Sequence, residues 1–314
     1  MDIAANWQRV PVILRAAVLG LGISFVGSTL AVVPLVLNLK FARALPWSLP
    51  IVLGITFAFW WWACGHWLPK SGGPRRRYLS RTDKPFRLGP SLLPTLAATL
   101  LVVAMRLVAP FFIPVPAPTF KAGSFHLSEL ALACGVLAIA VSSGVVEEIA
   151  FRGYAQRLLE DRFGVLIACL VGGVLFWIAH LPDVTIAHLP GQVIASLVFG
   201  YLAVATRSLV PPIIAHVGAD IVLQSAYAFR SPNWIWKALT ARPVWESPAT
   251  PTAESIGLAI LPTRMGLPNI LFWIFAGSVV LFAWSILRQT RAVANDPLSP
   301  APTHRQTLSK SDLD

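Results

Sequence analysis

Residues 128–158 read SELALACGVLAIAVSSGVVEEIAFRGYAQRL, an apolar run with charged side chains in its second half. A helix needs about 20 mainly apolar residues to cross the hydrocarbon core of a bilayer, and this run is long enough. A charge at the centre of such a helix costs roughly 2.5 to 3.5 kcal/mol on insertion scales. We therefore expect Glu147, Glu148 and Arg152 to have a function.

The rest of the chain is also strongly apolar. Hydrophobic residues make up 56% of it and charged residues 12%, against roughly 25% charged residues in an ordinary soluble domain. Besides 128–158, apolar segments lie at roughly 15–38, 46–68, 90–114, 163–181, 187–207, 209–228 and 268–288. These segments predict an all-α, polytopic membrane protein of about eight transmembrane helices that is in contact with the lipid bilayer.

The same segments predict the domain organisation. We expect N-terminal transmembrane helices and a basic loop in 1–127, followed by a catalytic helical core in 128–228. An outer loop rich in Trp and Pro covers 229–267, where Trp234, Trp236 and Trp245 suit the level of the lipid headgroups. A final transmembrane helix in 268–290 and a disordered polar tail in 291–314 complete the chain.

Positive charge is concentrated between the apolar segments. The loop from Lys70 to Arg87 is the densest basic stretch, so the positive-inside rule places it in the cytoplasm. With eight spans, both termini are then cytoplasmic, and we predict a multi-pass protein of a plasma (inner) membrane. Topology accounts for the net charge of +11 better than nucleic-acid binding does, so no nucleic-acid partner is expected.

Polar side chains recur at helical spacing in three of the apolar segments. Glu148 and Arg152 are i,i+4 neighbours that can pair, which leaves Glu147 free about 100° away on the helix. The same spacing sets Phe176 beside His180 and His216 beside Asp220. Three helices can thus aim Glu147, His180 and His216 at one point, where a carboxylate base and imidazoles suit a hydrolase.

Helix depth presents a difficulty for this arrangement. In straight helices along the membrane normal, His216 lies about 7 residues and His180 about 17 residues from the cytoplasmic end, a difference of roughly 15 Å. We therefore predict that the helices tilt, shift or break so that the site can form.

The ordered motifs resemble the CAAX protease and bacteriocin-processing family of intramembrane endopeptidases, also called the Abi family. That family has Glu-Glu-x-x-x-Arg, then Phe-x-x-x-His, then His-x-x-x-Asn or Asp, on successive helices. Residues 147–152, 176–180 and 216–220 match these motifs in order. The resemblance implies a conical intramembrane active site and cleavage of a membrane-associated peptide or protein substrate.

The resemblance also implies roles for individual residues. Glu147 would activate water, His180 would assist it or bind a metal, and His216 with residue 220 would support the oxyanion. The candidate catalytic set is Glu147, Glu148, His180, His216 and Asp220, with Arg152, Phe151 and Phe176 in support. Prenyl-processing members typically have Asn where Asp220 stands. Because an ionised Asp donates no hydrogen bond, Asp220 either stays protonated, orients His216 or binds a metal.

Metal use is left open by the sequence. If a metal is used, Glu147, His180 and His216 are its expected ligands, and zinc accepts that combination. The soluble zincin signature H-E-x-x-H is absent.

Two other functions were weighed against a peptidase. A non-catalytic immunity or chaperone-type membrane protein of the same fold would tolerate loss of the Glu and His residues. A transporter would use the carboxylates for proton coupling, but it predicts two related halves that this chain lacks.

Overall fold

The computed structural model describes residues 3–41, 46–83, 86–113, 128–181, 186–229 and 267–294. The predicted outer loop with its tryptophans and nearly all of the predicted tail lie outside the described residues. Every regular element in the described ranges is helical, which confirms the all-α prediction.

The N-terminal part contains five α-helices. They are α1 (Ile3–Arg9), α2 (Val12–Phe41), α3 (Ser48–Ala63), α4 (Gly73–Leu79) and α5 (Leu88–Val108), which ends in the 3-10 turn η1 (Ala109–Phe111). The core follows with α6 (Glu129–Glu147), the π-helix η3 (Glu148–Ala155), α7 (Gln156–Phe163), α8 (Val165–Ala179), η4 (Ile186–His188), α9 (Leu189–Thr206) and α10 (Val210–Phe229). Helix α13 (Leu267–Ala294) is the last described element.

Among the described residues, five helical stretches are long and apolar enough to cross a membrane, and three shorter helices are also apolar. Each of them overlaps one of the eight apolar segments of the sequence. A multi-pass membrane protein is thereby supported, while the count of eight spans stays a prediction.

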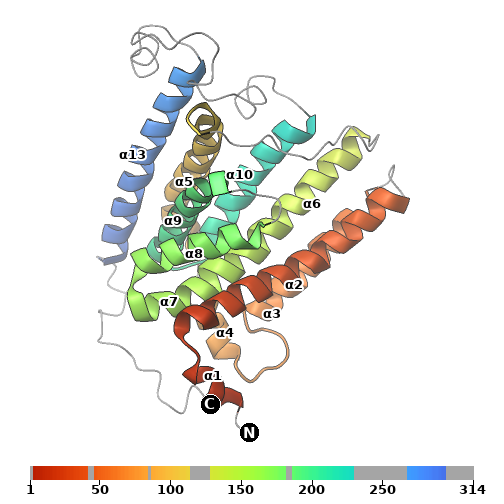
Figure 1. Ribbon diagram of the computed structural model, residues 1–314, viewed down its shortest axis with the longest axis vertical. Helices are drawn as coiled ribbons and strands as arrows, with labels where there is room; N and C mark the ends of the chain where they lie inside the picture. Colours follow the sequence, from red (N-terminus) through yellow and green to blue (C-terminus); the bar gives the residue numbers. More distant parts are fainter. Residues whose placement is uncertain are drawn as a thin grey trace.

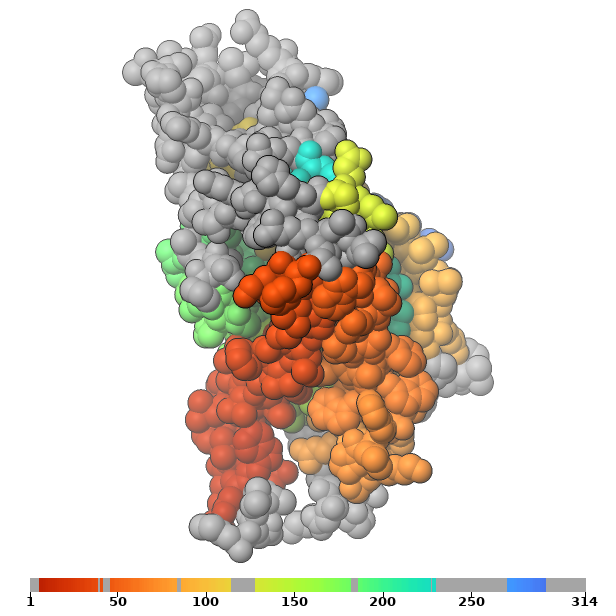
Figure 2. All heavy atoms as spheres, turned by 90° about the vertical axis from the view of Figure 1, so that its right-hand side faces the viewer, coloured from red at the N-terminus to blue at the C-terminus, as the bar shows by residue number. Residues whose placement is uncertain are grey.

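The outer surface is apolar where the sequence predicts lipid contact. On α2, Phe25 is 73% exposed, and on α13, Val280 is 69% exposed. Figure 2 shows the face formed by α2 and α3, in red to orange, along much of the lower half of the molecule. Such continuous apolar surface marks a membrane-facing protein rather than a soluble monomer.

The helices are not parallel. Figure 1 shows α13 and α5 close to the long axis, whereas α2 and α6 run diagonally to it. Helix α10 packs on α6 and α5, and α9 packs on α8 and α5, so the core helices surround a common interior. The predicted tilt between helices is therefore present.

Small residues determine how closely these helices approach. A Cβ built on Gly173 of α8 would lie 2.8 Å from the Cα of Val193 on α9. A Cβ on Gly144 of α6 would lie 2.5 Å from Cγ2 of Val217 on α10. Only glycine permits these two contacts, which fix α9 and α10 beside the polar residues of α6 and α8.

The segment 128–158 is not one continuous α-helix, as the sequence reading assumed. It changes to a π-helix at Glu148, directly after the free carboxylate Glu147. Within this stretch, the Arg152 carbonyl accepts a hydrogen bond from the side chain of Arg81, whose Nε lies 3.2 Å away. Inserted groups of this kind disturb the regular helical ladder, and π-helices often occur at functional sites.

Candidate active site

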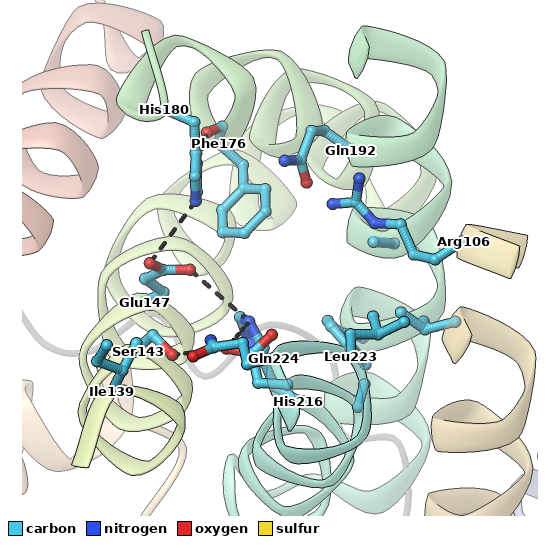
Figure 3. Close-up of a pocket in the computed structure, with 15 residues that line it drawn as sticks. Arg106, Ile139, Ser143, Glu147, Phe176, His180, Gln192, His216, Leu223 and Gln224 are labelled. Atoms are coloured by element: carbon cyan, nitrogen blue, oxygen red, sulfur yellow. Dashed lines mark hydrogen bonds and ion pairs between the residues drawn. The ribbon is translucent and has the colours of Figure 1, made fainter. Parts of the chain in front are cut away.

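A cavity of about 370 Å³ opens between α5, α6, α8, α9 and α10 (Figure 3). Its volume lies at the low end of the range for ligand pockets, about 300 to 1,000 Å³. Four of the predicted catalytic residues line it, namely Glu147, His180, His216 and Asp220. Phe176 also lines it, whereas Glu148, Arg152 and Phe151 are fully buried behind the wall.

Glu147 lies between the two histidines. Its Oε1 is 3.8 Å from His180 Nε2, and its Oε2 is 3.8 Å from His216 Nε2. Both separations are too long for a direct hydrogen bond and suit a bridging water molecule. Residues from three helices therefore meet at one carboxylate. The helices are tilted, so the different depths of His180 and His216 in straight helices do not keep the two side chains apart.

The hydrogen bonds of the imidazole rings orient the nitrogens that face Glu147. His180 Nδ1 lies 2.7 Å from the Phe176 carbonyl oxygen, which can only accept, so Nδ1 carries a proton. His216 Nδ1 lies 2.8 Å from Glu148 Oε1 and donates to that carboxylate. Both rings thus hold their Nε2 atoms toward Glu147.

Glu148 and Arg152 form the predicted i,i+4 pair. Arg152 Nη1 is 3.2 Å from Glu148 Oε1, and neither side chain is exposed. Because Glu148 Oε1 also accepts from His216, the pair links the buried arginine to an imidazole of the cavity. The Glu148–Arg152 pair therefore lies where it can support the His216 ring.

Aromatic rings enclose the same groups. The Arg152 guanidinium lies 4.7 Å from the centre of the Phe176 ring and 5.4 Å from that of Phe199. Phe199 stacks on His216 with ring centres 5.1 Å apart, and Phe151 contacts Phe176 edge-on at 5.2 Å. Cation–π contact offsets part of the cost of burying the guanidinium.

Asp220 accepts hydrogen bonds from two side chains that were not predicted. Ser143 Oγ donates to Asp220 Oδ2 at 2.7 Å, and Gln224 Nε2 donates to the same oxygen at 3.2 Å. His216 Nε2 is 3.9 Å from that oxygen. Of the three roles considered for Asp220, these contacts suit the one in which it orients neighbouring side chains.

The donor atoms do not form a metal site as they stand. Among the described residues, no group of three or more His, Cys, Asp or Glu side chains is arranged to hold a metal ion. The two oxygens of Glu147 face different histidines at 3.8 Å each, and the zinc prediction stays a prediction.

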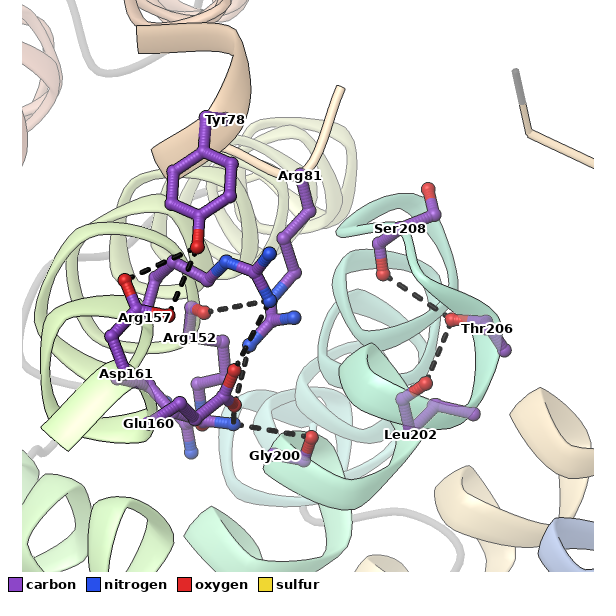
Figure 4. A network of polar contacts seen from close by, with 11 residues as sticks. Tyr78, Arg81, Arg152, Arg157, Glu160, Asp161, Gly200, Leu202, Thr206 and Ser208 are labelled. Carbon is purple, nitrogen blue, oxygen red and sulfur yellow. Dashed lines mark hydrogen bonds and ion pairs between the residues drawn. The ribbon is translucent and has the colours of Figure 1, made fainter. Parts of the chain in front are cut away.

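A polar network lies behind the π-helix (Figure 4). Arg81 bonds the Arg152 carbonyl and pairs with Glu160 at 2.5 Å, and Gln156 Nε2 bonds Glu160 Oε1 at 2.6 Å. Tyr78 donates to Asp161 at 2.9 Å. Burial raises the pKa of Tyr78, so this hydroxyl remains a donor at neutral pH. The basic loop that contains Tyr78 and Arg81 is thereby fastened to the helix of the site.

Sequence reasoning missed several residues of the cavity wall. They are Arg106, Ser143, Gln192, Phe199 and Gln224. For Arg106 the signal was available, because a charged residue inside an apolar segment is a functional candidate by default. The two glutamines and the phenylalanine had no comparable signal.

The fold and the site define an all-helical membrane protein with a Glu-His-His cluster inside its helical core. Residues 129–222 match the Rce1-like family, described as type II CAAX prenyl endopeptidase Rce1-like. Over this region, the match supports the resemblance that the motifs predict. Comparisons with curated proteins and with solved structures gave no match.

Proposed function

We propose that this protein is an intramembrane endopeptidase that hydrolyses peptide bonds in membrane-associated or C-terminally processed protein substrates. The observation that carries the proposal is the Glu147 carboxylate, which faces the Nε2 atoms of His180 and His216 at 3.8 Å each inside a cavity. A water molecule held between these groups would contact Glu147 as a base and His180 Nε2 as a hydrogen-bond acceptor.

In the proposed reaction, Glu147 takes a proton from this water while the water oxygen attacks the carbonyl carbon of the scissile bond. His180 Nε2 accepts a hydrogen bond from the same water. The oxyanion that forms accepts a hydrogen bond from His216 in its imidazolium form. Glu147 then delivers its proton to the leaving nitrogen, the C–N bond breaks, and the products are a carboxylic acid and an amine.

The remaining motif residues would hold these groups in place. Glu148 accepts from His216 Nδ1 at 2.8 Å and would stabilise the imidazolium, while Arg152 balances the charge of Glu148. Asp220, held by Ser143, would stabilise the same ring from its other side. Precise support of this kind matters because small displacements of catalytic groups lower rates strongly.

The proposal includes the location of the reaction. We propose eight membrane-spanning helices, cytoplasmic termini, a conical catalytic cavity within the plasma membrane, and a substrate that enters from the bilayer. The apolar helices and the family match support a multi-pass membrane peptidase.

The test is cleavage of a panel of membrane-anchored and C-terminally tagged peptides by the purified protein in liposomes. Glu147→Gln and His180→Ala are each expected to lower the rate by at least about a hundredfold, in line with loss of a general base. Glu129→Gln is the matched control, because Glu129 lies on the same helix at an exposed position outside the cavity. Cleavage that survives both site variants would contradict the proposal.

A chelator arm addresses the zinc prediction separately. Cleavage that continues in excess chelator supports water activation by Glu147 alone. Loss of cleavage that returns when zinc is added would instead assign Glu147, His180 and His216 to a metal. If no peptide is cleaved by any form, the non-catalytic immunity or chaperone-type function becomes the better explanation.

A further inference from the structure

An apolar groove of about 290 Å³ lies between α2 and α3, apart from the catalytic cavity. Its lining comes from these two helices, with Trp67 from the segment after α3 and Val146 from α6. Val146 directly precedes Glu147, but successive helix residues point about 100° apart, so the groove and the catalytic cavity lie on different sides of α6. Leu30 and Trp67 are each 50% exposed, so the groove is open to its surroundings.

The lining suits a hydrocarbon chain rather than a peptide. Apart from two indole rings, Thr56 has the one polar side chain among the described lining residues, and its hydroxyl already donates to the Val52 carbonyl at 2.7 Å. A peptide backbone in this groove would leave its N–H and C=O groups without partners, whereas an acyl chain has no such groups. Ile55, Phe59 and Trp62 follow one another along α3. They span about 10 Å, which is within half of the roughly 30 Å hydrocarbon core and fits one acyl chain from a single leaflet.

A guanidinium lies at the tryptophan end of the groove. The Arg76 guanidinium is 5.9 Å from the centre of the Trp62 ring. Its Nη2 donates to the carbonyl oxygens of Trp67 at 2.7 Å and Pro69 at 2.5 Å, so within the described residues Nη1 is left for a ligand. Helix α4, which contains Arg76, lies beside the end of α3 (Figure 1). Because tryptophan prefers the headgroup level of a bilayer, the guanidinium lies where lipid phosphates are found.

The positive charge around Arg76 is not balanced by acidic residues. Residues 48–82 contain no Asp or Glu, and Arg75 and Arg77 flank Arg76 on α4. None of these three arginines forms an ion pair within the part of the chain that the structure describes. A phosphate group would supply the missing negative charge, and guanidinium groups bind phosphate with two parallel hydrogen bonds.

We infer that Arg75, Arg76 and Arg77 bind the phosphate of an anionic phospholipid, one acyl chain of which lies in the groove between α2 and α3. Basic groups next to transmembrane helices commonly bind anionic lipid headgroups. A free phosphate group would use the arginines alone, whereas a phospholipid uses both the arginines and the groove beside them. The lipid site is separate from the catalytic cavity, so its test does not depend on peptidase activity.

The experiment measures lipid retention by the full-length protein. Protein in neutral detergent is incubated with equal amounts of phosphatidylglycerol and phosphatidylcholine that have the same acyl chains, and the lipids that remain after repurification are quantified. Phosphatidylglycerol is expected in at least about fivefold excess, the usual effect of one basic side chain near an anionic lipid surface. Equal retention of the two lipids overturns the inference.

Variants of the arginines locate that preference. Arg76→Gln is expected to abolish the excess, and Arg76→Lys to keep much of it because the charge remains. Arg75→Gln is expected to lower it without removing the bonds of Arg76 to the loop, which separates loss of charge from loss of loop structure. Arg162→Gln is the matched control, because Arg162 is exposed at the end of α7 outside the groove. An equal loss in the control would assign the preference to net charge and overturn the site.

A groove variant tests the acyl chain. Ala58→Phe places a ring in the groove and is expected to lower retention of phosphatidylglycerol, whereas Ile51→Phe, on the exposed face of the same helix, is expected to leave it unchanged. Thermal unfolding of both variants checks their fold. Glycerophosphoglycerol, which is the headgroup without acyl chains, should not displace the lipid at equal concentration. Full retention by Ala58→Phe, or displacement by the headgroup alone, would show binding by surface charge only and overturn the inference.

Discussion

Glu147 and Glu148 are adjacent in the chain but have opposite surroundings. Glu147 faces the cavity between two imidazoles, whereas Glu148 is fully buried against Arg152 and His216. Two carboxylates placed in different environments can divide their roles, one reacting and the other supporting. Substitutions at single residues can test this division.

The buried pair is expected to contribute to stability. Arg152→Met leaves the Glu148 charge without its partner, and loss of one member of a buried pair costs about 3 to 5 kcal/mol. The double variant Glu148→Gln with Arg152→Met should recover much of that loss, because it removes both charges of the buried pair. Thermal unfolding in detergent measures both effects, with Arg288→Met as an exposed control. Equal destabilisation in the single and double variants would argue against the pair.

The contact between Ser143 and Asp220 predicts coupled effects on activity. Ser143→Ala removes the hydrogen bond of 2.7 Å to Asp220 and should lower the cleavage rate about threefold to tenfold. In an Asp220→Ala background, the same change should have little further effect. Rates of all four forms on one peptide provide the comparison. Independent, multiplicative losses would show that Ser143 acts without Asp220.

Secondary-structure elements decide where these side chains meet. The π-helix begins at Glu148, and Gly144 lies one turn earlier, where α10 contacts α6. His216 directly precedes Val217, the residue that packs on Gly144. The depth and rotation of α10 relative to Glu147 therefore depend on this contact.

Gly144→Ala should disturb the site through the contact between helices. The added methyl group would lie 2.5 Å from Val217 Cγ2 and 3.2 Å from the Val217 backbone nitrogen, so α10 has to move. Overpacking of this kind costs about 1 to 3 kcal/mol, and we expect at least a tenfold loss of cleavage. Unfolding and cleavage assays measure the two effects.

Gly135→Ala on the same helix provides the control, because a Cβ there meets nothing within 4 Å. Stability should be unchanged or raised by about 0.5 to 1 kcal/mol, the usual benefit of alanine in a helix. Val217→Ala should partly rescue Gly144→Ala. If Val217→Ala does not rescue Gly144→Ala, and Gly135→Ala is as harmful as Gly144→Ala, the contact between Gly144 and Val217 does not explain the loss.

For the whole molecule, the basic loop is attached to the catalytic helix. Arg81 and Tyr78 connect α4 and the residues after it to α7 and the π-helix. The same side of the molecule contains the turn at Gly164 between α7 and α8. If the loop is cytoplasmic, this turn must be cytoplasmic as well.

The predicted topology can be tested with single cysteines. After Cys64, Cys134 and Cys169 are replaced, Arg162→Cys at the end of α7 should react with an impermeant maleimide only in permeabilised cells. Ser128→Cys, at the start of α6, should react in intact cells, because the helical stretch between them is long and apolar enough to cross the membrane. Labelling of both positions from the same side would contradict the span.

The sequence by itself determined the helical segments and the paired residues within each motif. Apolar length and i,i+4 spacing are local properties, so α6, α8 and α10 and the Glu148–Arg152 pair could be predicted correctly. The resemblance to the CAAX protease family followed from the same local motifs, and the match over residues 129–222 supports it. The outer loop, which lies outside the described residues, and the number of spans remain predictions.

Only the tertiary structure decided which residues share the cavity. Whether Arg106 and Gln192 face Glu147 depends on the rotation and depth of α5 and α9, which contacts between helices set. The π-helix likewise has a distant contact, because Arg81 bonds the carbonyl of Arg152, which is 71 residues away. Such contacts join distant parts of the chain, and local hydrophobicity and spacing contain no information about them.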